Sequence, residues 1–182
     1  MSCACFHIFT FFFPSLTSLP ACFSHYTPKV YYKYVNKLNV LYNKHSHLKK
    51  LFKNSIFSTL TFSCSSHIIT LEHVNSTNVL YGLCAICAFG SYNPIEGRHI
   101  ILFNLGLIQF SPGSIRLILS GTTCYGKVSI KSHEIRQSFT QYCPSGLLQW
   151  VAYGFKAVKS CTANIKHHFE EMYNQHCAEK LG

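Results

Sequence analysis

The sequence predicts an α+β fold: a small, mostly antiparallel sheet over residues 67–130, closed by a long C-terminal amphipathic helix over 145–180. Two observations lead to this class. Apolar, partly β-branched runs separated by turn residues fill the middle of the chain. Apolar side chains spaced three and four residues apart recur through its C-terminal part. With 182 residues, the chain is long enough for one domain with a hydrophobic core.

The strands are expected in the apolar runs between residues 67 and 130. HIITLEHV and NVLYGLCAICAFG precede the loop SYNPIEG, in which Asn93-Pro94 and Gly97 are turn signals. RHIILFNLGLIQF and SIRLILSG flank the sequence SPGS, Ser111 to Ser114. Two apolar runs on either side of a short Pro-Gly turn predict a β-hairpin, and TCYGKVSI would add a further strand.

The C-terminal helix is predicted from a heptad-like pattern. Steps of three and four residues separate Leu148, Val151, Phe155, Val158, Thr162, Ile165, Phe169, Met172 and His176. Pro144 suits the first turn of a helix, and Ser145 is the expected N-cap. Gly154 then lies inside the helix, where it costs about 1 kcal/mol relative to alanine.

Charge is distributed unevenly along the chain. There is no Asp, and the first of the six Glu residues is Glu72, so residues 1–71 carry no carboxylate side chain. The net charge is +10, although charged residues make up only 12% of the chain, where about 25% is usual. Such a balance favours an anionic partner. An arbitrary open reading frame would have a similar composition, so a newly evolved or spurious coding sequence is an alternative interpretation.

The region before residue 67 divides into an apolar segment, 1–24, and a basic segment, 25–66, ahead of the α+β unit at 67–182. Cys3 to Phe13 has the length of the apolar core of a signal peptide, although no Lys or Arg precedes it, and it is too short to span a membrane. A secreted, toxin-like or extracellular binding protein is therefore one alternative function. Asn75-Ser76-Thr77 is the candidate glycosylation site of such a protein.

Residues 29–53 have the period of an amphipathic helix, and they would be helical or weakly ordered. The apolar stripe consists of Val30, Tyr34, Leu38, Leu41, His45, Leu48 and Phe52. The candidate interaction residues are Lys33, Lys37, Lys44, Lys49, Lys50 and Lys53. A basic amphipathic helix binds an anionic membrane or a partner protein. Lysine with interleaved tyrosine also suits nucleic acid, and an ordinary helix with a solvated lysine face is the structural alternative.

No motif selects a catalytic site. A Gly-rich phosphate loop, a G-x-S-x-G elbow and an H-E-x-x-H sequence are all absent, and the lack of Asp excludes a Ser-His-Asp triad. Cys84-x-x-Cys87 lies within the apolar run LCAICAF, which favours core packing over a zinc or redox pair. In KSCTANIKHHFEEMYNQHC, Lys159 to Cys177, the best pairs join His167 or His168 to Glu171. Each pair supplies two ligands where zinc needs at least three.

No specific function follows from the sequence. We expect a small, basic, non-enzymatic protein without a metal, cofactor or small-molecule substrate. An anionic membrane surface or a partner protein fits its charge and apolar content better than nucleic acid does. The expected location is a membrane surface or the secretory pathway.

Overall fold

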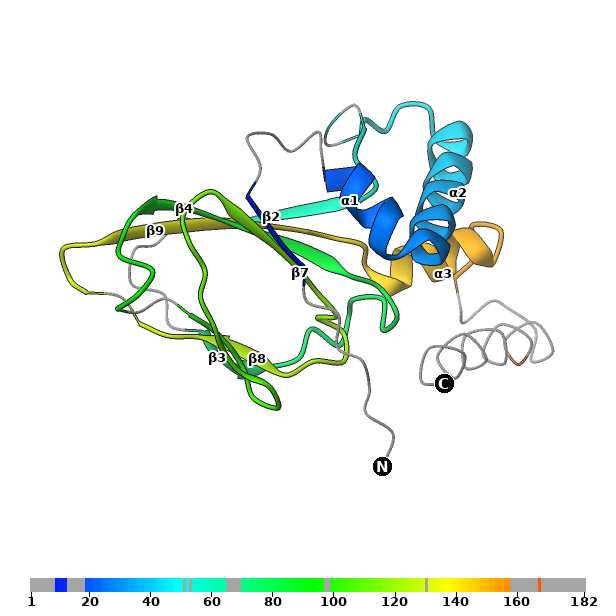
Figure 1. Cartoon of the computed structure of the whole chain (residues 1–182). Helices are drawn as coiled ribbons and strands as arrows, with labels where there is room; N and C mark the ends of the chain where they lie inside the picture. The colour runs from blue at the N-terminus through cyan, green and yellow to red at the C-terminus, as the bar shows by residue number, and fades with distance from the viewer. Residues whose placement is uncertain are drawn as a thin grey trace.

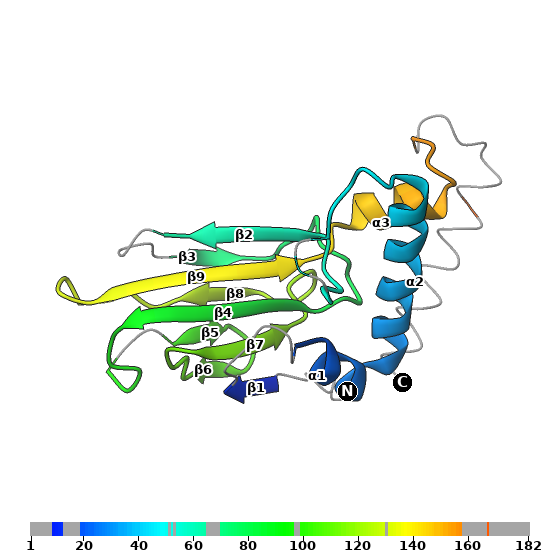
Figure 2. The same ribbon diagram turned by 90° about the horizontal axis from the view of Figure 1, so that it is seen from above.

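The structure is a computed structural model that describes residues 9–12, 19–50, 52, 54–64, 70–96, 99–129, 131–157 and 167. Within these residues, two antiparallel sheets and three helices form three layers (Figures 1 and 2). The five-stranded sheet contains, in spatial order, β1 (Phe9–Phe12), β7 (Ser114–Ile118), β4 (Cys84–Ser91), β9 (Ile135–Tyr142) and β2 (Thr59–Ser63). The four-stranded sheet contains β3 (Thr70–His73), β8 (Tyr125–Lys127), β5 (Ile100–Leu102) and β6 (Gly106–Ile108).

The five-stranded sheet is the middle layer, and the first five residues of its central strand, β4, are buried on both faces. One face packs against α1 (Leu19–Tyr26), α2 (Pro28–Lys44) and α3 (Ser145–Ala152), and the other faces the four-stranded sheet. Successive side chains of a strand point to opposite faces. Ala85 and Cys87 of β4 therefore join the core beneath the helices, whereas Cys84 and Ile86 join the core between the sheets.

An aromatic cluster connects the helices to the five-stranded sheet. Phe57, just before β2, packs edge-on against Phe23 of α1 and Tyr34 of α2, with ring centroids 5.7 and 6.3 Å away. All three rings are almost completely buried. Pro28 begins α2 at a position where its missing N–H costs nothing. The buried face of α2 is Val30, Tyr34, Leu38 and Leu41, four positions of the predicted apolar stripe.

The predicted fold class is wrong, because strands dominate the residues that the structure describes, and the helix described after them, α3, has only eight residues. The sheets also extend beyond the predicted range of 67–130. β2 comes from the basic segment 25–66, and β9 follows residue 130. In β9, Arg136 and Ser138 point toward the core between the sheets, so the strand lacks the apolar alternation that would have identified it.

The predicted helix over 145–180 ends early, at Ala152. Gly154 adopts a φ of 65°, its N–H donates to Val151 O at 3.2 Å, and the Phe155 N–H donates to Trp150 O at 2.8 Å. The Phe155 ring packs edge-on against Trp150, with centroids 4.9 Å apart. These bonds and this contact form a Schellman motif, which terminates a helix. The predicted heptad positions from Val158 onward lie outside the described residues.

The hairpin expected across Ser111–Ser114 is also wrong. β6 belongs to the four-stranded sheet and β7 to the five-stranded sheet, so the Pro-Gly turn carries the chain from one sheet to the other. Gly113 adopts a φ of 74°, and its N–H donates to Ala88 O of β4 at 2.8 Å. The local hairpin is instead β5–β6, in which the Leu105 N–H donates to Leu102 O at 2.8 Å.

Candidate functional site

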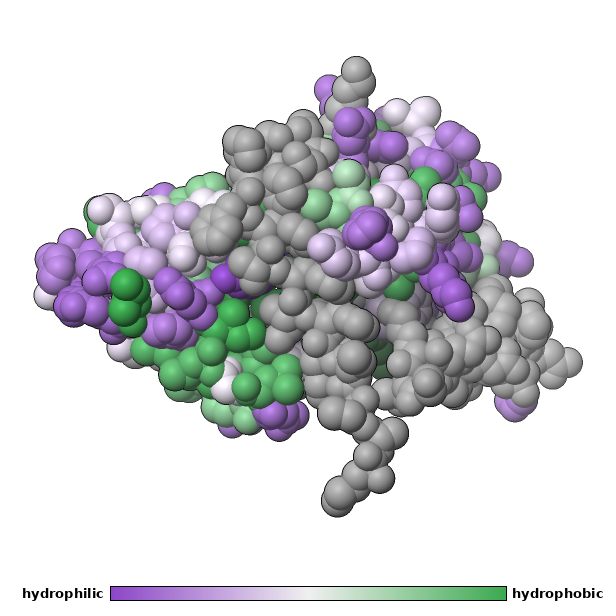
Figure 3. Space-filling model, in the orientation of Figure 1, coloured by the Kyte–Doolittle hydropathy of each residue, from purple (hydrophilic) through white to green (hydrophobic). Residues whose placement is uncertain are grey.

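Four lysines lie along one flank of α2, which we call the basic flank: Lys29, Lys33, Lys37 and Lys44. Residues four or eleven positions apart lie on the same side of an α-helix, so these side chains form one row along a helix of 17 residues. The Lys33 Nζ lies over the Tyr81 ring, 5.0 Å from its centroid. Lys37 is half-buried, and this burial lowers its pKa. In Figure 3, the α2 side of the molecule shows mostly hydrophilic and intermediate side chains, with a few hydrophobic ones among them.

The chain continues from α2 into a mixed basic and apolar segment. Leu48, Lys49, Lys50 and Phe52 are all exposed, and we call them the basic-apolar segment. The Lys50 Nζ lies 5.6 Å from the Tyr42 ring centroid. Leu48 and Phe52 were predicted in the apolar stripe, but the helix ends at Lys44 and leaves them at the surface. Lys53 lies outside the described residues.

The apolar face of α2 is not available to a membrane. Val30, Tyr34, Leu38 and Leu41 are buried against the five-stranded sheet and α1. His45 extends this contact, because its ring stacks on Trp150 with centroids 5.3 Å apart. The helix can therefore present its basic flank, but it cannot insert its apolar stripe without leaving the core. Within the described ranges, no helix is long and apolar enough to cross a membrane.

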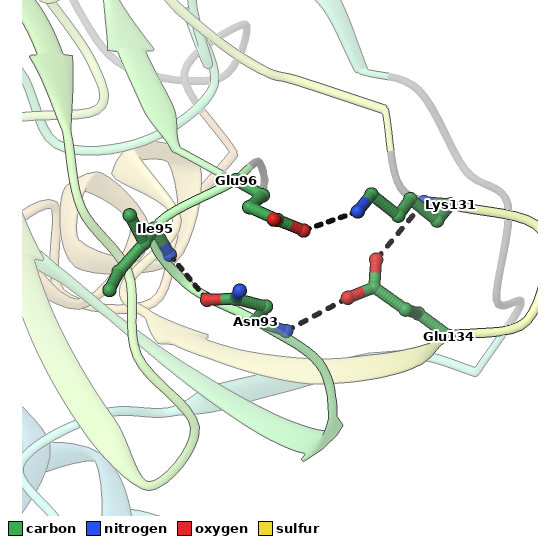
Figure 4. A network of polar contacts seen from close by, with 5 residues as sticks. All are labelled: Asn93, Ile95, Glu96, Lys131 and Glu134. Atoms are coloured by element: carbon green, nitrogen blue, oxygen red, sulfur yellow. Dashed lines mark hydrogen bonds and ion pairs between the residues drawn. The ribbon is translucent and has the colours of Figure 1, made fainter.

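Carboxylates gather at the end of the molecule opposite α2. Glu96, in the connection after β4, pairs with Lys131, in the connection before β9 (Figure 4). Glu134 accepts hydrogen bonds from the backbone N–H groups of Asn93 at 2.8 Å and Lys131 at 3.1 Å. Figure 2 shows these connections at the far end of the sheet from α2. The described part of the chain is thus basic at the helical end and acid-containing at the other.

The Cys84-x-x-Cys87 pair lies in β4, with its two thiols in different cores. Cys84 points between the sheets and Cys87 toward the helices, because three residues along a strand reverse the side. Burial raises the pKa of each thiol to about 11. The two sulfurs therefore cannot bind one metal ion together. Among the described residues, no group of three His, Cys, Asp or Glu side chains could hold a metal.

The remaining predicted site residues are dispersed. Asn75 is half-buried, and its Nδ2 donates to the Tyr125 hydroxyl at 2.7 Å, so the amide of the candidate glycosylation site contacts the protein interior. The stretch Lys159–Cys177 lies outside the described residues apart from His167. Three cations that no sequence pattern indicated face the core between the sheets: Arg116, Lys127 and Arg136. Each stands alone in its run, and only the sheet register reveals the group.

Comparisons with known proteins provide no family. No family model matches the sequence, and no curated protein matches it. Among solved structures, NgTET1 in complex with 5mC DNA matches with a TM-score of 0.44 and 15% identity, over 58% of this chain and 42% of that chain. The viral collagen prolyl hydroxylase of Paramecium bursaria Chlorella virus-1 matches with a TM-score of 0.32 and 10% identity, over 75% of this chain and 78% of that one. The chain spans less than half of NgTET1, and we derive no function from likenesses at these TM-scores.

Proposed function

We propose that this chain is a small, non-enzymatic protein that associates peripherally with an anionic membrane. The contact surface consists of the basic flank of α2 and the basic-apolar segment that follows it. One observation carries the proposal: Leu48 and Phe52 are exposed on either side of Lys49 and Lys50, next to a row of lysines. Lysine attracts anionic lipid headgroups, while exposed Leu and Phe side chains bury apolar area at the interface.

The charge distribution supports this orientation. No carboxylate side chain occurs before Glu72, so no acid of the first 71 residues neutralises the contact surface. The acidic network of Glu96 and Glu134 lies at the opposite end of the five-stranded sheet. We therefore expect an anionic surface to attract the helical end in preference to the other end. Each lysine near such a surface contributes about 1 kcal/mol of binding free energy.

The buried stripe of α2 determines the mode of binding. Since Val30, Tyr34, Leu38 and Leu41 remain in the core, the helix lies on the membrane by its lysines and does not embed. Binding should therefore be reversible and weaken as ionic strength rises, because salt screens exposed charges. The exposed Leu48 and Phe52 side chains add a smaller, salt-independent contribution.

Sedimentation with vesicles tests the proposal. We expect the full chain to bind vesicles that contain phosphatidylserine and to remain in solution with pure phosphatidylcholine. The triple variant Lys44→Gln, Lys49→Gln and Lys50→Gln should bind roughly a hundredfold more weakly, since about 1 kcal/mol is lost per lysine. Lys131→Gln, at the acidic end, is the matched control and should bind like the wild type.

Two outcomes would contradict the proposal. Equal binding to the neutral and anionic vesicles would show that binding is not electrostatic. A triple variant that binds like the control would show that these lysines do not contact the membrane. Competition by a DNA duplex in the same assay distinguishes the nucleic-acid hypothesis from the membrane hypothesis. If the duplex binds tightly with a steep salt dependence while vesicles do not sediment the protein, the partner is nucleic acid.

A further inference from the structure

β2 forms one edge of the five-stranded sheet. It pairs with β9 on one side, and in the part of the chain that the structure describes no strand pairs with its other side. Its five residues read TLTFS, and the side chains of Thr61 and Phe62 are exposed. A strand at the edge of a sheet presents unpaired backbone N–H and C=O groups, which another strand can satisfy.

This edge lacks the features that usually protect a sheet from further pairing. Lysine, proline, a bulge or a very short strand commonly blocks an edge. β2 has no charged residue and no proline, and all five of its residues pair with β9 in an unbroken register. The edges of the four-stranded sheet differ, because β3 contains Glu72 and shifts its register, and β6 has only three residues. β2 is therefore open to a further strand.

An aromatic row reaches the same edge. The Phe62 ring centroid is 6.2 Å from that of Phe139, and the Phe139 ring stacks on Phe89 with centroids 5.2 Å apart. Phe139 is buried in the core beneath the helices, but Phe62 is 66% exposed and Phe89 is 40% exposed. The row thus presents open aromatic surface next to the unpaired backbone of β2. Exposed apolar side chains beside an open strand edge are typical of a contact site.

The sequence of β2 is complementary to a second copy of itself. In an antiparallel pair centred on Thr61, Leu60 of each copy lies opposite Phe62 of the other. Both side chains point to the helix side of the sheet, because they pack against the core beneath the helices or pair with a residue of that core. On the other side, Thr61 lies opposite itself and Thr59 lies opposite Ser63. Aromatic–aliphatic and Thr–Thr or Thr–Ser pairs are favourable across antiparallel strands, and no like charges meet.

This pairing also keeps the basic ends of the two copies apart. A two-fold axis perpendicular to the sheet relates two identical antiparallel strands, so the copies point in opposite directions. The basic flank of α2 in each copy then lies at the same end as Glu96 and Glu134 of the other, because these groups lie at opposite ends of the sheet (Figure 2). Two chains of net charge +10 would repel each other strongly if their basic ends met. The charge distribution therefore favours a second copy in this orientation.

We propose that β2 is a dimer interface, at which a second copy of this chain adds its own β2 in antiparallel orientation, centred on Thr61. The two five-stranded sheets then form one continuous sheet. Each copy uses the same strand, so the contact is closed and gives a dimer rather than a filament. The contact is small, and we expect reversible association with a dissociation constant in the micromolar range. The interface does not depend on the membrane contact proposed above.

Sedimentation velocity of the full chain at about 100 µM tests the interface, since this concentration exceeds a micromolar dissociation constant. We expect a dimer that dissociates on dilution. Thr61→Lys places two lysines opposite each other and should weaken dimerisation at least about tenfold, as should Thr61→Glu. Thr61 is exposed, so both variants should fold like the wild type, which circular dichroism checks. An equimolar mixture of the two variants should dimerise at least as tightly as the wild type, because Lys then lies opposite Glu.

Leu107→Lys is the matched control. It adds the same charge at an exposed position on β6, away from the interface, and should dimerise like the wild type. The proposal is overturned if the wild type is monomeric at this concentration, if it forms a series of larger oligomers, or if Thr61→Lys and Leu107→Lys behave alike. It is also overturned if the mixture of Thr61→Lys and Thr61→Glu stays monomeric, since residue 61 would then not lie opposite itself.

Discussion

Replacing Phe57 with alanine is expected to lower the free energy of unfolding by about 3–5 kcal/mol, the usual cost of removing a buried phenylalanine. Phe57 is 1% exposed and contacts α1 and α2 through Phe23 and Tyr34. A domain has a total stability of only about 5–15 kcal/mol, so the variant would be marginal. Urea unfolding followed by the fluorescence of the single tryptophan, Trp150 of α3, measures the loss.

Phe62→Ala is the matched control, because it removes the same side chain from a position that is 66% exposed in β2. Surface substitutions usually change stability by less than about 0.5 kcal/mol. Phe62 contacts the Phe139 ring, so a small loss of stability in Phe62→Ala agrees with the structure. If Phe57→Ala were no more destabilising than Phe62→Ala, the helices would not pack on the five-stranded sheet through this cluster.

Gly90→Ala should also destabilise the protein strongly, by about 3 kcal/mol or more. Gly90 has a φ of +117°, which is strained for any residue with a Cβ, and an added Cβ would lie 2.1 Å from the Ile135 carbonyl oxygen. That oxygen belongs to the backbone of β9, so the strand itself must move. The shift would separate Gly90 from Arg136, its partner in the ladder. Chemical denaturation measures the change.

Gly106→Ala separates the backbone strain at a positive φ from the steric contact with β9. Gly106 has a similar φ of +102°, but an added Cβ would meet no atom within 4 Å. This control should lose only the backbone component, about 1–3 kcal/mol. The difference between the two variants then reports the steric contact between β4 and β9. Equal losses would show that β9 does not approach β4 as closely as the structure indicates.

The position of α2 could be predicted because its apolar side chains face a core. Val30, Tyr34, Leu38 and Leu41 repeat at helical spacing, and all four are buried. The pattern did not indicate where the helix ends. Leu48 and Phe52 fit the same spacing, but they lie after the last residue of the helix. The basic character of this region could also be predicted, because the lysines and the lack of Asp and Glu are read directly from the sequence.

The predictions of the long C-terminal helix and of the hairpin were wrong for local reasons. Gly154 was counted as an internal glycine with a small cost, but its hydrogen bonds and the contact of Phe155 with Trp150 make it a helix terminator. At Pro112-Gly113, the turn signal was correct, but a turn does not specify whether its flanking strands pair with each other. Here the Gly113 N–H bonds to β4, and the chain changes sheet.

The three cations between the sheets were inaccessible to sequence analysis for a topological reason. Arg116, Lys127 and Arg136 come from three strands in two sheets, and ladder register and sheet stacking turn them toward the same core. Each lone charge resembles a surface residue when read in sequence. The expectation that no small molecule is bound followed from the absence of a motif, and it stays a prediction.

Arginine side-chain NMR tests most directly whether the two sheets stack with Arg116 and Arg136 inside. The chain has three arginines, so a sample labelled with ¹³C and ¹⁵N in arginine alone gives three guanidinium Nε–H signals. Two should exchange slowly with water and carry ring-current shifts from the Phe110 ring that they face, and Phe110→Leu should move both. If all three exchange rapidly and keep their shifts in Phe110→Leu, the arginines face solvent, and the account of the two stacked sheets is wrong.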